Sequence, residues 1–339
     1  MSRLSAGAYA GLVVTSVGVW VMVGMLCLLV GSTGVGIPSG EQLGYRLGFV
    51  LVASLVGAAL SAAGVAYQAV LRNPLADPYL LGVASGATLG VMAWRFPAGL
   101  GSVGAVAGAV GQQGAALVGA LVAVGVVLGL SSRRGRLEPV TLLLVGVIVS
   151  SLCSAGLLLM MSIRPEILAN GGGVAGVLVG AMQTNLTREQ LATAAALVGA
   201  GWLVLMWVGP GLGVATLSDG EAGSMGVRVQ RLRWVALVTA SVVVGAGVAI
   251  SGPIGFVGLI CPHLGRMLVG PDPRRLLPVA TALGAGLLAG ADGLCRLLAM
   301  QELVATLLPV GVVTAILGGP FFLMLLGGRR GTGSEAMRQ

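Results

Sequence analysis

Long apolar runs, each about the length of a membrane-spanning helix, recur along the whole chain. Apolar runs of about 17–25 residues are long enough to cross a bilayer as α-helices, and run length predicts about ten of them here. We expect the spans near residues 9–30, 47–69, 79–96, 114–130, 140–161, 190–208, 233–250, 254–268, 277–295 and 308–327. The pattern predicts an all-α polytopic membrane protein with a single transmembrane domain over residues 1–339.

One further apolar segment, 165–185, has a different character. Five glycines interrupt it, and they are Gly171, Gly172, Gly173, Gly176 and Gly180. We expect this segment to form a short external or re-entrant helix, because an eleventh full span would reverse every later loop.

Composition and charge support a lipid environment. Of the 339 residues, 56% are hydrophobic and only 9% are charged, which is too little charge to cover the surface of a soluble domain. The net charge is +8, and all 19 basic residues are arginines, since the chain has no lysine. These arginines cluster in the short gaps between apolar runs, so we attribute them to membrane orientation and expect no nucleic-acid partner.

The arginine distribution also selects an orientation. If the N-terminus is cytoplasmic, the predicted outer loops hold only five arginines: Arg46, Arg95, Arg164, Arg188 and Arg296. The other fourteen of the 19 then lie on the inside. Arginine-rich short loops resist translocation, so we expect both termini in the cytoplasm.

Catalytic and metal-binding patterns are not found in the sequence. The four cysteines are widely separated, which fits neither a disulfide framework nor a zinc site. No HExxH or GxSxG motif occurs, and Ser150, Ser151 and Ser154 have no base nearby in sequence. A Walker A loop needs a lysine, so this chain cannot bind ATP in that way. We expect a transport subunit, with no cofactor of its own and no resident metal, that is not an enzyme.

An ion-coupled secondary transporter of a small metabolite remains an alternative. Such transporters use carboxylates or histidines buried at mid-membrane. Here most acidic residues fall in predicted loops or at helix ends, and Asp292 lies one helical turn before Arg296, where the two can neutralise each other. The single histidine, His263, lies beside Pro262 near a predicted helix end, where a structural role is expected.

Two stretches are too specific for ordinary membrane packing. The first includes Asn73-Pro-Leu-Ala-Asp-Pro78, and the second includes Gly252-Pro-Ile-Gly-Phe-Val-Gly-Leu259 followed by Pro262-His263 and Arg266. The prolines in each are expected to end one helix and restart the next. Val56–Ala58, Gly64 and Pro74 are echoed by Val244–Ala246, Gly252 and Pro262 at equal spacing, which weakly suggests an inverted internal repeat.

With the Asp292–Arg296 pair, these motifs make the chain resemble the FecCD-type permeases of ABC importers over nearly its whole length, from Arg46 to the closing stretch after Pro309. Members of this family carry vitamin B12, haem or ferric siderophores. The resemblance implies a BtuC-like fold with ten helices per subunit, and a homodimer with the transport pathway between the two copies. It also implies the bacterial cytoplasmic (inner) membrane as the location.

The resemblance implies roles for particular residues. Asn73 and Leu75 match the family's cytoplasmic gate. A proline-containing turn is the equally plausible reading from the residues alone. Residues 217–227 match the loop that touches the ATPase, and the residues implied in this coupling are Asp219, Glu221, Ala222, Met225 and Gly226.

Arg46 and Arg296 match arginines that pair with a soluble binding protein on the outside. Phe49 stands where a second arginine is usual in the family. From physics alone, each arginine could equally be an interfacial side chain that reaches toward water.

The partners implied are a second permease copy, two ATP-binding subunits that hold ATP and Mg, and an extracytoplasmic substrate-binding protein. The cargo implied is a bulky metal chelate. An iron-siderophore or haem is favoured by the frequency of these cargoes in the family, and a corrinoid is possible.

Overall fold

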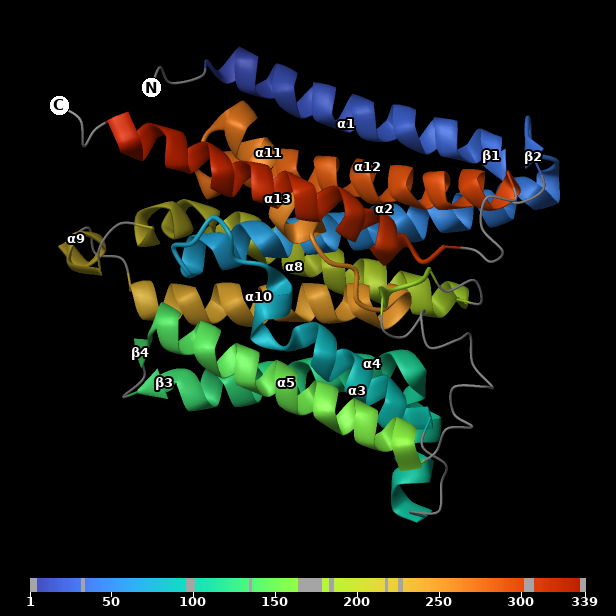
Figure 1. The fold of residues 1–339 in the computed structure, drawn as a ribbon, viewed down its shortest axis with the longest axis horizontal. Helices are drawn as coiled ribbons and strands as arrows, with labels where there is room; N and C mark the ends of the chain where they lie inside the picture. Colours follow the sequence, from blue (N-terminus) through green and yellow to red (C-terminus); the bar gives the residue numbers. More distant parts are fainter. Residues whose placement is uncertain are drawn as a thin grey trace.

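The computed structural model describes residues 5–31, 34–95, 101–133, 136–163, 179–182, 186–216, 219–224, 228–301 and 308–335. Within these ranges the chain folds into a bundle of long α-helices that run along a common axis (Figure 1). The predicted all-α membrane fold class is confirmed.

The long helices are α1 (Ala6–Leu29), α2 (Gly40–Val70), α4 (Gly101–Ser131), α5 (Pro139–Ile163), α8 (Arg188–Ala215), α10 (Val229–Ser251), α12 (Pro273–Met300) and α13 (Val310–Glu335). The shorter ones are η1 (Pro78–Leu81), α3 (Val83–Arg95), α9 (Asp219–Ser224) and α11 (Val257–Val269). Two small antiparallel hairpins complete the fold: β1 (Val30–Gly31) with β2 (Gly34–Val35), and β3 (Ser132–Arg133) with β4 (Arg136–Leu137).

In the described part of the chain, seven helices are long and apolar enough to cross a membrane. Three shorter apolar helices, Val83–Trp94, Val257–Val269 and Val310–Met324, accompany them. Each of the ten predicted ranges coincides with one of these helices. The interpretation of segment 165–185 lies outside the described residues except at 179–182.

Three helices form the buried centre of the bundle. In α2, α10 and α12, 72% of the most apolar window is buried, compared with 11% in α1 and 22% in α5. Glycines allow the central helices to approach closely: a Cβ on Gly57 would overlap the backbone of Gly284 in α12. Without a hydrophobic force between helices in lipid, such backbone approach holds the bundle together.

The two ends of the bundle carry different elements. α1 begins and α13 ends at the same end, beside α9 and the β3–β4 hairpin, whereas the β1–β2 hairpin lies at the opposite end (Figure 1). Below, the first is called the cytoplasmic end and the second the outer end, after the predicted orientation.

Two central helices are followed by breaks. After α2 comes the connection 71–82, which contains η1, and then α3. After α10 comes the connection 252–256 and then α11. α3 and α11 each have 13 residues, or about 20 Å of rise, which is less than the roughly 30 Å hydrocarbon core of a bilayer. Each break is therefore followed by a helix that is shorter than a full span. Their similarity agrees with the internal echo, and the inverted relation stays a prediction.

Candidate functional site

The connection 71–82 begins as a tight turn at the cytoplasmic end. The Asn73 side-chain oxygen accepts a hydrogen bond from the Leu75 N–H at 3.0 Å, and the Asn73 carbonyl accepts one from the Ala76 N–H at 3.1 Å. Arg72 adopts a positive φ of 49° just before it. An asparagine that bonds the backbone two residues on is a common turn former. Asn73 therefore has a structural role in this conformation, whatever part it has in a gate.

The same connection then interlocks with the break after α10. The Tyr79 hydroxyl accepts a hydrogen bond from the Ile254 N–H at 2.6 Å. The Asp77 carboxylate accepts one from the Tyr79 N–H at 2.9 Å, and the Phe256 N–H is a second donor to it. The two singled-out sequence stretches thus meet at one point, where side chains of the first accept from backbone N–H groups of the second. Non-helical backbone inside a membrane protein requires such partners.

Asp77 is the one carboxylate at this junction among the contacts described. The Tyr79 and Phe256 N–H groups both donate to it. These donors favour its charged form, since an N–H bonds more strongly to a carboxylate than to a neutral acid. The carboxylate therefore serves as an acceptor shared by two chain segments.

A polar relay extends the junction toward the cytoplasmic end. Gln68 of α2 donates from Nε2 to the Gly258 carbonyl at 3.4 Å and accepts at Oε1 from Arg266 Nη2 at 2.6 Å. Gly64 lies one turn earlier in α2, and a Cβ there would overlap the Gly258 carbonyl. This glycine contact brings α2 and α11 close enough for the relay to form.

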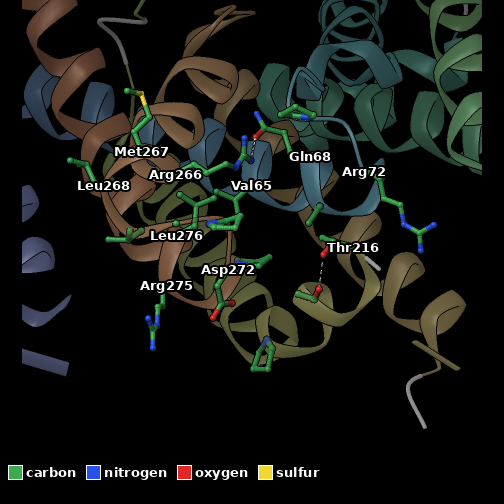
Figure 2. A pocket seen from close by; sticks show the side chains of 18 of the residues that line it. Val65, Gln68, Arg72, Thr216, Arg266, Met267, Leu268, Asp272, Arg275 and Leu276 are labelled. Atoms are coloured by element: carbon green, nitrogen blue, oxygen red, sulfur yellow. Dashed lines mark hydrogen bonds between the residues drawn. The ribbon is translucent and has the colours of Figure 1, made fainter. Parts of the chain in front are cut away.

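A cavity of about 950 Å³ opens at the cytoplasmic end next to this relay. The ends of α2 and α8 and the connection between α11 and α12 surround it, and Asn73 lies on its wall. In Figure 2, Arg266 points toward Gln68, whereas Arg72 and Arg275 lie on opposite sides of the cavity. Leu75 is partly buried and is not part of the lining. The structure thus places the two gate candidates in different surroundings.

A second cavity, of about 550 Å³, lies beside α5. Ser150, Ser151 and Ser154 line it together with Tyr79. Ser151 donates back to the Val147 carbonyl at 2.9 Å, as serines in membrane helices commonly do. No histidine or carboxylate is among the described lining residues, so the serines have no base beside them for nucleophilic chemistry.

The predicted ATPase-coupling loop contains a short helix, α9, at the cytoplasmic end. Ala222 is fully buried against Ala215 and Val229, and Glu221 is exposed. Asp219 begins α9, but its side chain is outside the described part, as are Met225 and Gly226 altogether. The described half of the loop is therefore anchored on one side and open on the other.

At the outer end, Arg46 forms hydrogen bonds within the chain. Its side chain is buried, and Nη1 donates to the Leu28 and Gly36 carbonyls at 2.9 and 3.1 Å. Nη2 donates to the Gly34 carbonyl at 3.4 Å. The guanidinium thus fastens the β1–β2 hairpin to the start of α2.

Arg296 is also engaged within the chain. It forms an ion pair with Asp292 at 2.8 Å and lies over the Phe49 ring, 3.6 Å from its centroid. Phe49 therefore stacks under a guanidinium at the position where the family usually has an arginine. The predicted neutralisation of Asp292 is present. Both arginines bond within the single chain, and their docking role stays a prediction.

Sequence reasoning missed Tyr79 and Gln68 as site residues. The sequence does contain one signal for them, because both are polar residues within strongly apolar stretches. A buried hydroxyl or amide needs a hydrogen-bond partner. Among the described residues there is no group of three histidine, cysteine or acidic side chains that could hold a metal ion.

Comparison with known proteins places this arrangement in a family. The model of the FecCD transport family matches residues 38–327. A cobalamin import permease, BtuC, from Halobacterium salinarum is 37% identical over 296 residues, which cover 86% of this chain and 75% of that protein. The hemin transport permease HmuU of Yersinia pestis is 37% identical over 293 residues, covering 84% and 82% respectively.

A solved structure has the same fold. It is described as an inward-facing conformation of a metal-chelate type ABC transporter, and it superposes with a TM-score of 0.77 and 28% identity. The match covers 94% of this chain and 99% of that one. The interlocked breaks, the helical bundle and the family match over most of its length agree, and the chain belongs to the FecCD transport family.

Proposed function

We propose that the chain is the membrane-spanning permease subunit of an ATP-binding-cassette importer that moves a bulky metal chelate into the cytoplasm. The observation that carries this proposal is the family match over residues 38–327. The chain has no lysine for a Walker A loop, so ATP and Mg are bound by a separate subunit.

The proposed assembly is a homodimer of this permease with two ATP-binding subunits and an extracytoplasmic substrate-binding protein. It lies in a bacterial cytoplasmic membrane with both termini inside, as the arginine distribution favours. Nucleotide binding must favour one of two arrangements of the permease, because a ligand without differential affinity shifts no equilibrium.

Within this assembly, Asn73 and Leu75 belong to the cytoplasmic gate. The α9 region transmits the ATPase motion through Asp219, Glu221, Ala222, Met225 and Gly226. The burial of Ala222 supports a rigid connection to the α8 and α10 ends, and the exposure of Glu221 supports contact with a partner.

Binding-protein docking occurs at the outer end, where Arg46 and Arg296 are placed. Because both guanidiniums bond within the chain, we propose that they act by fixing the shape of the docking surface. Exposed groups around them then make the direct contacts.

The cargo class follows from the relatives. Their names include permeases for cobalamin, hemin and Fe(3+)-citrate, which are all metal chelates. We favour an iron chelate or haem, with a corrinoid as the other member of the class.

Reconstitution tests the proposal. The permease is placed in liposomes with an ATP-binding subunit and a substrate-binding protein of this family from the same organism, and uptake of haemin, ferric siderophores and cyanocobalamin is measured. We expect uptake of one of these that requires ATP and the ATPase subunit and resists a protonophore. Uptake without the ATPase that collapses with a protonophore would instead establish ion-coupled transport and refute the proposal.

A further inference from the structure

The connection 252–256 is held from one side by the first half of the chain. The Ile254 N–H bonds to the Tyr79 hydroxyl at 2.6 Å, and the Phe256 N–H bonds to Asp77. Pro78, between Asp77 and Tyr79 in the sequence, lies against the start of α11, where a Cβ on Gly258 would come within 2.8 Å of its ring. The backbone of the connection is thus fastened at two points two residues apart.

Phe256 has an unusual conformation that this fastening supports. Its φ is +68°, in the left-handed region that side chains other than glycine rarely adopt. Such a conformation persists only where surrounding contacts over-determine it. The hydrogen bond from the Phe256 N–H to Asp77 is one of those contacts. Phe256 is also the N-cap residue of α11.

The Phe256 side chain then reaches the last helix. A Cβ added to Gly318 of α13 would overlap the Phe256 ring, so the ring lies directly on the α13 backbone. Gly318 is the residue that permits this approach, and the strained backbone of Phe256 directs the ring toward it.

A second contact leads from the same connection to α13. Gly180 lies against Pro253 and Ile254, and its carbonyl accepts a hydrogen bond from the Gly311 N–H at 3.3 Å. Both routes end in the first half of α13. The opposite face of α13 is exposed in this chain, with Ile316 65% and Leu323 69% accessible, so its placement depends on the contacts on the bundle side.

We propose that Asp77 and Tyr79 are positioning residues: by fastening the connection 252–256 they fix where α13 lies against the rest of the bundle. The first half of the chain thus influences the position of the last helix through this connection. In the proposed importer, a shift of the connection would move α13, which links the paired breaks to the rearrangement that transport requires.

The chain offers a closely matched control. The Tyr67 hydroxyl is hydrogen-bonded to the Ser241 hydroxyl at 2.6 Å, a pairing that also joins α2 to the α10 region. Tyr67→Phe therefore removes a buried tyrosine hydroxyl with a bond of equal length, but leaves the connection 252–256 intact. Tyr79→Phe removes the acceptor for Ile254, and Asp77→Asn removes the charge that binds two N–H groups.

Hydrogen exchange of the full-length permease in nanodiscs measures the effect without a label or a cargo. We expect Tyr79→Phe and Asp77→Asn to speed exchange about 10-fold in peptides covering 252–260 and also in those covering 310–320, since losing one such bond lowers the opening free energy of what it holds. Tyr67→Phe should leave both regions as in the wild type.

Three results would overturn the proposal. Faster exchange in 252–260 alone would show that the fastening is local, and unchanged exchange in both regions would show that it holds nothing. Equal acceleration of 310–320 by Tyr67→Phe would show general softening of the bundle. Because hydrogen exchange is measured without transport, the result of this test does not depend on the proposed function.

A second measurement tests the consequence for transport and rests on the proposed function. In liposomes with the ATPase and binding protein, Tyr79→Phe should lower uptake of haemin, ferric siderophore or cyanocobalamin per ATP hydrolysed by about 10-fold, with Tyr67→Phe near wild type. Wild-type coupling in Tyr79→Phe would refute the link to transport. Absence of uptake by the wild type would count against the proposed function, and the exchange result would still decide the placement of α13.

Discussion

The middle of the bundle and its outer end both contain buried polar groups, but the hydrogen bonds of these groups differ in the sequence distance that they span. In the middle, Tyr79 bonds a residue 175 positions away. At the outer end, Arg296 bonds Asp292 four positions earlier, and Arg46 bonds carbonyls 10 to 18 positions away. The middle interactions join the two halves of the chain, whereas the outer ones complete a helix end and a hairpin.

This difference separates two consequences of mutation. Removing a local interaction at the outer end should lower the stability and leave the relative position of the two halves unchanged. Removing a long-range interaction in the middle should change how the halves lie relative to each other, at a smaller cost in stability.

The largest effect is expected from Arg296→Met at the outer end. The substitution leaves the Asp292 carboxylate buried without its partner, and breaking a buried pair from one side costs about 3–5 kcal/mol. Unfolding in mixed micelles with increasing sodium dodecyl sulfate measures this free energy against the wild type.

The double variant Asp292→Leu/Arg296→Met provides the control. It removes both charges, so we expect it to recover most of the lost stability, since apolar replacement of a buried pair is often nearly neutral. If the double variant is as unstable as the single one, the ion pair is not the cause of the loss.

In the middle of the bundle, Gly64→Ala should have the next largest effect. The new Cβ would overlap the Gly258 carbonyl, and overpacking of this kind typically costs about 1–3 kcal/mol. The same unfolding titration checks it. Gly125→Ala in α4 is the matched control, because nothing lies within 4 Å of a Cβ there, and alanine is the better helix former.

A loss of stability in Gly125→Ala equal to that in Gly64→Ala would show that the cost comes from glycine replacement in general. In that case the contact between α2 and α11 would not be what holds the middle together.

The sequence predicted the helices well because their signal is local. Run length alone identifies a span, and the proline-containing stretches mark the two breaks. The pairing of those breaks was not predictable in the same way, because Tyr79 and Ile254 meet only after the chain has folded. A single sequence holds no direct information on which distant backbone N–H a buried hydroxyl will find.

For the outer arginines, the sequence predicts the position along the chain but not the partners of the side chains. Their position at the outer end follows from the charge distribution and the resemblance, and it stays a prediction. Their side-chain direction did not follow, because a guanidinium near a helix end can reach water or cap nearby carbonyls with equal ease. The carbonyls of Leu28, Gly34 and Gly36 became visible as partners of Arg46 only in the folded hairpin.

Phe49→Leu should give a smaller effect at the outer end. Leucine keeps apolar volume but removes the ring face under Arg296, and a partly desolvated cation–π contact contributes about 1 kcal/mol. The titration should show a loss of that size in the wild-type background. In the Arg296→Met background the same substitution should cost less, and an equal cost there would assign the effect to packing alone.

The smallest effect on stability is expected from Glu221→Gln in α9, which lies at the cytoplasmic end and belongs to neither region. Glu221 is exposed, and substitutions at exposed positions usually change stability by less than about 0.5 kcal/mol. The proposed coupling role nevertheless predicts weaker stimulation of the ATPase subunit by the permease, measured as ATP hydrolysis with and without this chain. Unchanged stability with reduced stimulation would show that coupling at this end is separate from the bonds that hold the middle and the outer end.

Ala222→Leu provides the comparison, because it overfills the buried contact with Ala215 and Val229. If Glu221→Gln leaves stimulation unchanged and Ala222→Leu abolishes it, then α9 transmits force through its buried face and not through its exposed charge.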